Sequence, residues 1–234
     1  MSRYRTFIVL RHSTLPSTPR PPLAHTDRTR VRYTARGSFD RDLAYAIIDE
    51  AVVAHVGLVD EGHPVVIPML HARLDDRLYL HGSPATRLMR RLKAGVEVCV
   101  TLTLLDGLVL ARSAFHHSAN YRSVVLFGEA AAVSGIDERR AVLDAYVDRL
   151  LPNRRSQLRP MTDKEVRGTA ICSIPIHEGS VKVRSGGPVD EPEDYALPIW
   201  AGVLPARKGY GPPVPDPRND PALQVPDHVL DLTR

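Results

Sequence analysis

Along most of the chain, apolar and polar residues alternate in short runs, and this period of two predicts half-buried β-strands. The clearest run is VEVCVTLTL, whose apolar residues share one face: Val96, Val98, Val100, Leu102 and Leu104. Strands are also expected at residues 53–59, 64–72, 78–81, 108–115, 122–133, 169–175 and 180–183. Because these strands follow one another with few helices between them, the pattern predicts successive antiparallel pairs.

Turn residues separate several of these strands. Asp60-Glu61-Gly62, Asp75-Asp76 and Asp106-Gly107 are each expected to close a hairpin. HHSANY, residues 116–121, is interpreted as a loop between two further strands.

Helical spacing is confined to a few segments. Asp40 is expected to cap a helix with Leu43 and Ile47 on its apolar face. Asp137 is expected to cap a second helix, whose apolar stripe includes Tyr146. Strands with a few helices at their ends predict a mainly β fold, a small β-barrel with peripheral helices, in place of a doubly wound α/β fold.

One further helix, PATRLMRRLKA, is short and strongly basic. Ser83 is a favoured N-cap residue, Pro84 suits the first helical position, and Gly95 is a natural left-handed terminator. A stretch of seven residues within this helix contains four cationic side chains, Arg87, Arg90, Arg91 and Lys93.

Two interpretations of this basic helix stay open on the residues alone. Gly82 would let a ligand approach the backbone, so a phosphate at the helix start would meet free amides together with Arg87. Alternatively, the segment is a capped surface helix with a solvated basic face, and Ser83 is then explained by capping.

Composition limits the class of protein. With 234 residues, of which 43% are apolar and 25% charged, the chain suits one compact domain with extensions. A net charge of +4 without a continuous basic face does not call for a nucleic-acid partner. Cys99 and Cys172 lack CxxC spacing and are expected as reduced, buried thiols of a cytoplasmic protein. No run reaches the roughly 20 apolar residues of a membrane span, and residues 6–10 are too short for a signal-peptide core.

The two ends of the chain differ from its middle. Residues 1–37 are rich in Pro, Arg and Thr without apolar periodicity and are expected to form a loosely ordered N-terminal arm. Residues 206–234 form a Pro-rich tail, which could wrap over a surface or a partner subunit. The folded domain is therefore expected at residues 38–205.

The order of several motifs resembles a known family. IPMLHAR, LYLHGSPATRL, SAFHHSANYRSVVLFGEA, KVRSGGP and DYALPIWAGVLP together look like the flavin-binding split barrels related to pyridoxamine 5′-phosphate oxidase. The branch that includes nitroimidazole-resistance proteins is the most similar. The resemblance implies a six-stranded FMN-binding split barrel and a homodimer with an FMN site at each of two places between the subunits.

The resemblance also implies site residues by motif. The strand beside the flavin ring matches Ile67, Pro68, Met69, Leu70 and the following His71. The loop and helix start that hold the phosphate match His81, Gly82, Ser83 and Arg87. Polar residues from later strands, from the same or the partner subunit, match His116, Ser118 and Asn120, with His117 and Tyr121 as candidate catalytic donors. Arg184 and Trp200 belong to the carboxy-terminal motif and could close over the ring.

Departures from the oxidase narrow the expected function. The basic strand and the Ser-Arg-Lys run of that enzyme are missing, so oxidation of pyridoxamine phosphate is not expected. The preferred hypothesis is an FMN-dependent oxidoreductase acting on a small planar, nitro- or quinone-like substrate. The alternatives are a flavin- or haem-binding storage or sensor protein, for which His71 and His116-His117 are the haem candidates, and a deazaflavin-dependent reductase.

Other chemistries fit the sequence less well. Adjacent histidines on extended chain point to opposite faces and no third ligand is spaced with them, so His116-His117 is not expected to bind a metal ion. Ser118 lacks a GxSxG setting, which argues against a hydrolase. Met69 and Leu70 could equally be core residues, and Trp200 could be buried at a subunit contact.

Overall fold

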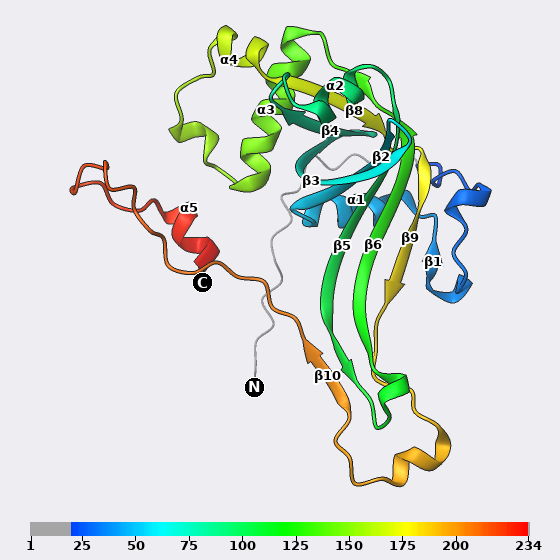
Figure 1. The fold of residues 1–234 in the computed structure, drawn as a ribbon. Helices are drawn as coiled ribbons and strands as arrows, with labels where there is room; N and C mark the ends of the chain where they lie inside the picture. Colours follow the sequence, from blue (N-terminus) through cyan, green and yellow to red (C-terminus); the bar gives the residue numbers. More distant parts are fainter. Residues whose placement is uncertain (1–19, 234) are drawn as a thin grey trace.

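The computed structural model describes residues 20–233, and within them the chain forms one antiparallel sheet with helices at its ends (Figure 1). The strands are β1 (Gly37–Ser38), β2 (Val53–Asp60), β3 (His63–Leu74), β4 (Arg77–Gly82), β5 (Glu97–Leu110), β6 (Ser118–Glu129), β7 (Ala131–Ala132), β8 (Ala170–Pro175), β9 (Glu178–Arg184) and β10 (Gly202–Pro205). The α-helices are α1 (Arg41–Glu50), α2 (Arg87–Lys93), α3 (Ile136–Leu150), α4 (Asp163–Gly168) and α5 (Asp227–Leu230). The prediction of a mainly β fold with peripheral helices is confirmed.

The strand order is β1-β9-β6-β5-β2-β3-β4-β8-β7, with β10 added to β5. Strand β3 pairs with β2 through Leu70 and with β4 from His71 onward. This change of partner within one strand turns the sheet into a partly closed barrel, and it leaves one edge of residues 63–70 without a strand partner among the described residues.

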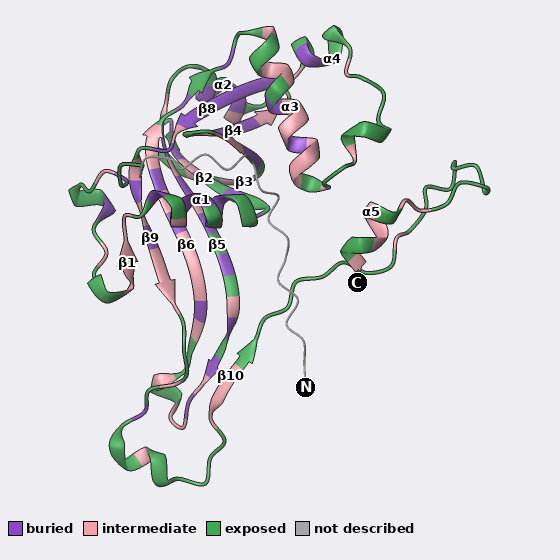
Figure 2. Ribbon diagram, turned by 180° about the vertical axis from the view of Figure 1, so that it is seen from behind, coloured by how far each residue is buried: buried purple, intermediate pink, exposed green. Residues whose placement is uncertain are grey.

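The core follows the alternation seen in the sequence. Val98, Val100, Leu102 and Leu104 of β5 all point inward and are buried, as predicted. Helix α1 packs Ala44, Ile47 and Ile48 into the same core. A smaller core lies between the sheet and α3 and contains Ala72, Tyr79, Val133, Val142, Tyr146 and Ile171. In Figure 2 the buried residues gather where the strands meet α1 and α3.

The basic helix begins later than predicted. Residues 83–86 form a turn in which the amide of Thr86 donates to the carbonyl of Ser83, and α2 starts at Arg87. Thr86 is the N-cap, because its hydroxyl accepts a hydrogen bond from the amide of Met89. The prediction that Ser83 is the N-cap is therefore wrong. Gly95 does adopt the predicted left-handed conformation, with φ +79°.

The hairpin predicted at Asp106-Gly107 is also wrong. Strand β5 continues to Leu110 with only a shift of register at this point. Gly107 is needed for a close approach, since a Cβ there would lie 2.8 Å from the carbonyl oxygen of Leu204 in β10. The turn falls instead at residues 111–117, so β6 starts at Ser118 and four of the six residues of the expected HHSANY loop are strand.

The lengthened strands form an extension below the barrel. We call it the β5–β6 extension: residues 103–122, with β10 and the loop 185–201 at its far end (Figure 1). The side chain of Arg112, in the turn that follows β5, binds the buried Asp190 at 3.0 Å and holds that loop next to the turn. Although burial opposes ionisation of the Asp190 carboxyl, Arg112 holds its pKa below the usual range.

The ends of the chain can be described from residue 20 to residue 233. Residues 20–37, expected within a loosely ordered arm, contact β9: Leu23 is buried, and Arg28 pairs with Glu178 at 2.6 Å and with Glu97. The first 19 residues of that expected arm lie outside the described residues. The Pro-rich tail runs away from the barrel and carries α5 (Figure 1). In the part of the chain that is described, no helix is long and apolar enough to span a membrane.

Candidate functional site

A pocket of about 360 Å³ lies between the first half of β3 and α2. One side of it is apolar, formed by Leu58, Val65, Ile67, Pro68, Met69, Leu88 and Met89. The other side is polar, formed by Asp60, Thr86, Arg87 and Arg91, and Gly82 completes the lining. Its volume falls within the roughly 300–1,000 Å³ of small-molecule sites.

The polar side is organised by a buried carboxylate. Asp60 ends β2 with its side chain only 4% exposed, and it pairs with Nε of Arg87 at 3.2 Å and with Nε of Arg91. Arg91 also reaches the exposed Glu61 at 3.3 Å. Arg87 keeps 65% of its side chain exposed. Asp60 and Glu61 together balance the charge of the two guanidinium groups, but Arg87 is largely exposed and has no other carboxylate partner among the described residues, so its guanidinium group is available to an anionic ligand.

The apolar side is set by the alternation of β3. Val65, Ile67 and Met69 are half-buried and face inward, whereas Val66 and Leu70 are exposed on the outer face. The strand edge without a partner borders the pocket. Unpaired backbone N–H and C=O groups on such an edge offer both donors and acceptors to a planar heterocycle.

Several of the predicted site residues line this pocket, but others that are adjacent to them in the sequence do not. Ile67, Pro68, Met69, Gly82 and Arg87 line it. Leu70 points to the outer face of the sheet. Ser83 lies in the adjoining turn, exposed, where its hydroxyl accepts a hydrogen bond of 3.4 Å from the amide of Ala85.

The two histidines of the matched motifs lie away from the pocket. His71 is 1% exposed, and its Nε2 donates to the carbonyl of Ile48 at the end of α1. Burial, reinforced by the nearby Arg149, lowers the pKa of His71 to about 4. His81 faces α3, where the centres of its ring and of the Tyr146 ring are 4.1 Å apart in an edge-to-face arrangement, and burial lowers the pKa of His81 too. Both were expected at the cofactor, but their positions on β3 and β4 turn them toward the helices.

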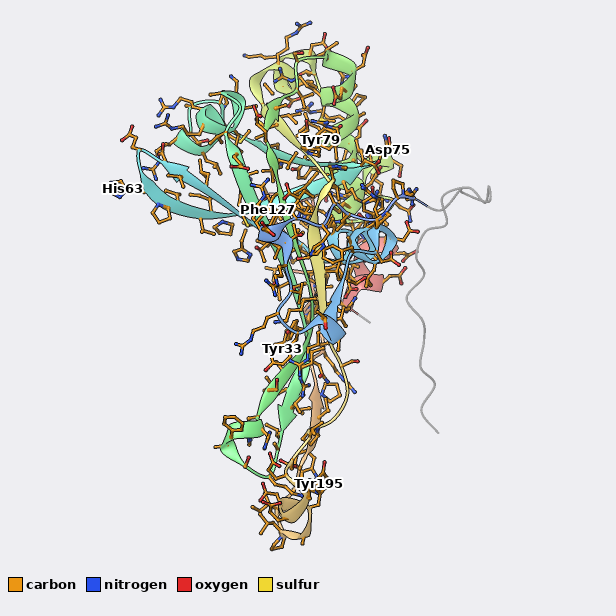
Figure 3. All side chains as sticks on the ribbon, turned by 90° about the vertical axis from the view of Figure 1, so that its right-hand side faces the viewer. Tyr33, His63, Asp75, Tyr79, Phe127 and Tyr195 are labelled. Carbon is orange, nitrogen blue, oxygen red and sulfur yellow. The ribbon has the colours of Figure 1, made fainter. Side chains whose placement is uncertain are left out.

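The remaining predicted residues gather on the β5–β6 extension and on β9, at the end of the strands remote from the pocket: His116, His117, Ser118, Asn120, Tyr121, Arg184 and Trp200. In Figure 3, Tyr195 of the same end lies far from His63 at the tip of the β2–β3 hairpin. Within one chain, the structure does not bring this group to the pocket.

The local contacts of this group are nevertheless specific. The side-chain oxygen of Asn120, a buried residue, accepts from Arg184 at 2.5 Å, and its amide donates to the carbonyl of Gly186 at 3.0 Å. His117 donates from Nδ1 to the carbonyl of Ser113 at 2.8 Å. Trp200 is 70% exposed, so one chain alone does not bury it.

Sequence reasoning missed Asp60, Thr86 and Arg91. Asp60 occupies an inward position in the alternation of residues 54, 56, 58 and 60, and a charged residue in that series signals a buried ion pair. Arg91 follows Arg87 by four residues, and this spacing places both side chains on one face of a helix. Across residues 20–233 no group of three or more His, Cys, Asp or Glu side chains is arranged to hold a metal ion.

Comparison with known proteins places this architecture. A sequence model of the family described as pyridoxamine 5′-phosphate oxidase matches residues 40–183. The flavocytochrome Anf3 of Azotobacter vinelandii is similar in structure with a TM-score of 0.82 and 44% identity, over 90% of this chain and 99% of that one. An FAD and haem binding protein of Mycobacterium smegmatis gives a TM-score of 0.81 and 37% identity, over 85% and 97%.

A more distant similarity is to a protein assigned as a 5-nitroimidazole antibiotic resistance protein from Bacteroides thetaiotaomicron. Its TM-score is 0.52 and its identity 26%, over 63% of this chain and 86% of that one. A search of curated proteins gave no match. The fold is thus a split barrel of the flavin-binding type, and the chain belongs to the pyridoxamine 5′-phosphate oxidase-like family.

The burial of His71 generates a testable pH dependence. In the unfolded chain its pKa is 6.5, whereas in the fold it is about 4, so the unfolded state binds the extra proton between these values. Above pH 6.5 His71 is neutral in both states and does not affect the pH dependence. As the pH falls from 6.5 toward 4, protonation favours the unfolded state, and the free energy of unfolding decreases by up to about 3 kcal/mol. His71→Gln can keep the hydrogen bond to Ile48 without titrating, so its free energy of unfolding, measured in urea, should fall less over this range than that of the wild type. Parallel pH profiles for the two proteins would refute the assignment.

Proposed function

We propose that this protein is a flavin-dependent oxidoreductase whose flavin binds in the pocket between β3 and α2. The observation that carries the proposal is an apolar lining with a free strand edge that lies next to the guanidinium groups of Arg87 and Arg91, both held by Asp60. A flavin has matching parts, with a planar ring at one end and a phosphate at the other.

The residues present fit such a cofactor. Val65, Ile67 and Met69 would cover the ring and exclude water, while the free edge of β3 would supply hydrogen bonds to its polar rim. Arg87 and Arg91 would bind the phosphate, and Asp60 would hold both guanidinium groups in place. The bound flavin supplies the redox chemistry, and the protein supplies position and electrostatics.

The names of the relatives support a flavin over other cofactors. One similar protein is named a flavocytochrome and another an FAD and haem binding protein. FMN, the form expected from the sequence, contains every group that this pocket addresses. For the substrate we propose a small, planar, electron-poor molecule of nitro or quinone type, supported by the similarity to the nitroimidazole-resistance protein. Two free thiols, with burial raising the pKa of Cys172 to about 11, suit a reducing, cytoplasmic location.

We further propose that the protein works as a homodimer with its flavin sites between the subunits. The outer face of the sheet carries exposed apolar side chains from β2, β3 and β5, namely Val53, Val59, Val66, Leu70, Leu105 and Leu108. Such a face suits an interface between protomers. A partner could also bring His117 and Tyr121 of its extension to a pocket that they do not reach within one chain.

The role of Arg87 can be tested by flavin binding. Arg87→Ala should weaken FMN binding by about tenfold or more, because it removes one charge-assisted hydrogen bond to the phosphate. Fluorescence quenching of added FMN measures the affinity. Arg218→Ala in the exposed tail removes the same charge and should bind FMN as the wild type does. Unchanged FMN affinity in Arg87→Ala would remove the phosphate site from the proposal.

The dimer can be tested at the outer face. Val66→Glu places a charge on the apolar outer face, so we expect a monomer by sedimentation velocity and a loss of bound flavin. Val214→Glu introduces the same charge at a tail residue that is 92% exposed and should leave the dimer intact. A Val66→Glu protein that stays dimeric would contradict this interface.

A second candidate function is haem binding in addition to flavin, and the geometry of His117 favours it. Its Nδ1–H donates to the Ser113 carbonyl, which fixes the tautomer and leaves Nε2 as a free acceptor on an exposed residue. Metal-bound histidines usually donate their other ring N–H to a carboxylate, a backbone carbonyl or a water molecule. His71, the other haem candidate, already uses Nε2 in the core.

Haem titration tests whether His117 is a ligand. We expect a Soret band on haem addition that is lost or shifted in His117→Ala. The band should persist in His63→Ala, which removes an exposed histidine from the β2–β3 turn. Identical haem spectra for the wild type and His117→Ala would exclude His117 as a ligand, and a haem protein without turnover of any acceptor would favour storage or sensing.

A further inference from the structure

The far end of the β5–β6 extension carries unpaired negative charge. We call this end the extension tip: the turn 111–117 and the loop 185–201, which lie together at one end of the molecule (Figure 1). The loop has neither Lys nor Arg and contains four acidic residues, Asp190, Glu191, Glu193 and Asp194. Asp190 is buried and paired with Arg112, and Glu191 lies 3.5 Å from Nε2 of His116. Glu193 and Asp194 lie in a 3-10 turn and form no ion pair with any described residue.

The extension tip also exposes a group of large apolar side chains. Two of them, Phe115 and Trp200, are 89% and 70% exposed. The others are Val189, Tyr195, Leu197 and Ile199, and Tyr195 marks this end of the molecule in Figure 3. Apolar groups gathered beside charged ones are typical of a surface that meets another protein.

Helix α2 carries the complementary charge. Residues 83–95 contain four cations and neither Asp nor Glu. Arg87 and Arg91 are held by Asp60 at the pocket. Arg90 and Lys93 are exposed, and neither forms an ion pair within residues 20–233. Their spacing of three makes them neighbours on the helix surface, so α2 offers two unpaired cations beside the pocket.

The two charged surfaces cannot meet within one chain. The extension tip and α2 lie at opposite ends of the molecule (Figure 1). They can meet between two copies, because every copy carries both surfaces. In a dimer with two-fold symmetry each extension tip would reach the α2 of the other protomer, so the contact would form twice.

The apolar outer face leads from one surface to the other. Leu108 of β5 is exposed on this face, and β5 ends only two residues later, about 7 Å at a rise of roughly 3.3 Å per residue. Val66 and Leu70 expose the same face of β3, whose first half separates it from the pocket beside α2. A protomer that packs Leu108 against the β3 of its partner therefore brings its extension tip next to that pocket.

We propose that the extension tip of one protomer docks on α2 of a second copy of this chain. Glu193 and Asp194 face Arg90 and Lys93 in this contact, and the apolar side chains of the tip cover the opening of the flavin pocket and exclude water from it. The inference rests on the proposed homodimer and names the two surfaces that orient it. The cations of α2 thereby divide their roles, with Arg87 and Arg91 at the ligand and the other two at the partner.

Charge reversal on the full-length protein tests this contact. Glu193→Arg/Asp194→Arg reverses the extension tip, and Arg90→Glu/Lys93→Glu reverses α2; none of these four residues lines the flavin pocket. Each variant alone places like charges opposite each other at both contacts of the dimer. We expect its dimer dissociation constant, measured by sedimentation velocity, to rise by about tenfold or more.

An equimolar mixture of the two variants should restore the dimer. The positive tip of one variant then meets the negative α2 of the other, and the reverse holds at the second contact. The protein with all four substitutions should also dimerise as the wild type does. FMN affinity, measured by fluorescence quenching on the same samples, should fall in each variant alone and return in the mixture, which also shows that both variants are folded.

The matched control is Asp216→Arg/Asp220→Arg, which reverses two exposed charges of the tail and should leave the dimer unchanged. The proposed contact would be overturned by variants that dimerise like the wild type, by a mixture that stays monomeric, or by a wild type that is itself monomeric. A wild type that follows the expected charge pattern but binds no flavin would instead overturn the flavin proposal and leave the contact in place.

Discussion

The buried carboxylate of Asp60 is the interaction on which the pocket depends. It lies at the end of β2 and pairs with Arg87 and Arg91, so it joins the β2–β3 hairpin to α2 across the opening of the pocket. A carboxylate buried to this extent needs both a countercharge and hydrogen bonds. The same contact fixes the orientation of two guanidinium groups in advance of any ligand.

The change of partner along β3 provides the other half of the site. Because β3 leaves β2 and joins β4 at His71, its first half keeps a free edge that borders the pocket. The same geometry turns His71 and His81 toward α1 and α3, where they stabilise helix packing. One structural feature therefore determines which residues of the conspicuous IPMLHAR and LYLHG motifs can contact a ligand.

Local patterns predicted much of the fold, since strand alternation depends on neighbouring residues. The inward face of β5 and the left-handed Gly95 are examples. The errors arose where distant parts of the chain decide the outcome. Gly107 is a glycine because β10 approaches it, not because the chain turns there. The burial of His71 depends on helices that flank it only in three dimensions, and motif matching could not separate the residues of the pocket from those of the remote extension.

Hydrogen–deuterium exchange with and without a flavin tests the central claim, that the pocket between β3 and α2 is the cofactor site, most directly. The free edge of β3 at residues 63–70 and the turn at residues 83–86 should exchange more slowly when FMN or FAD is present, because a bound ligand would cover them. Protection that appears elsewhere while these two segments remain unchanged would contradict the account.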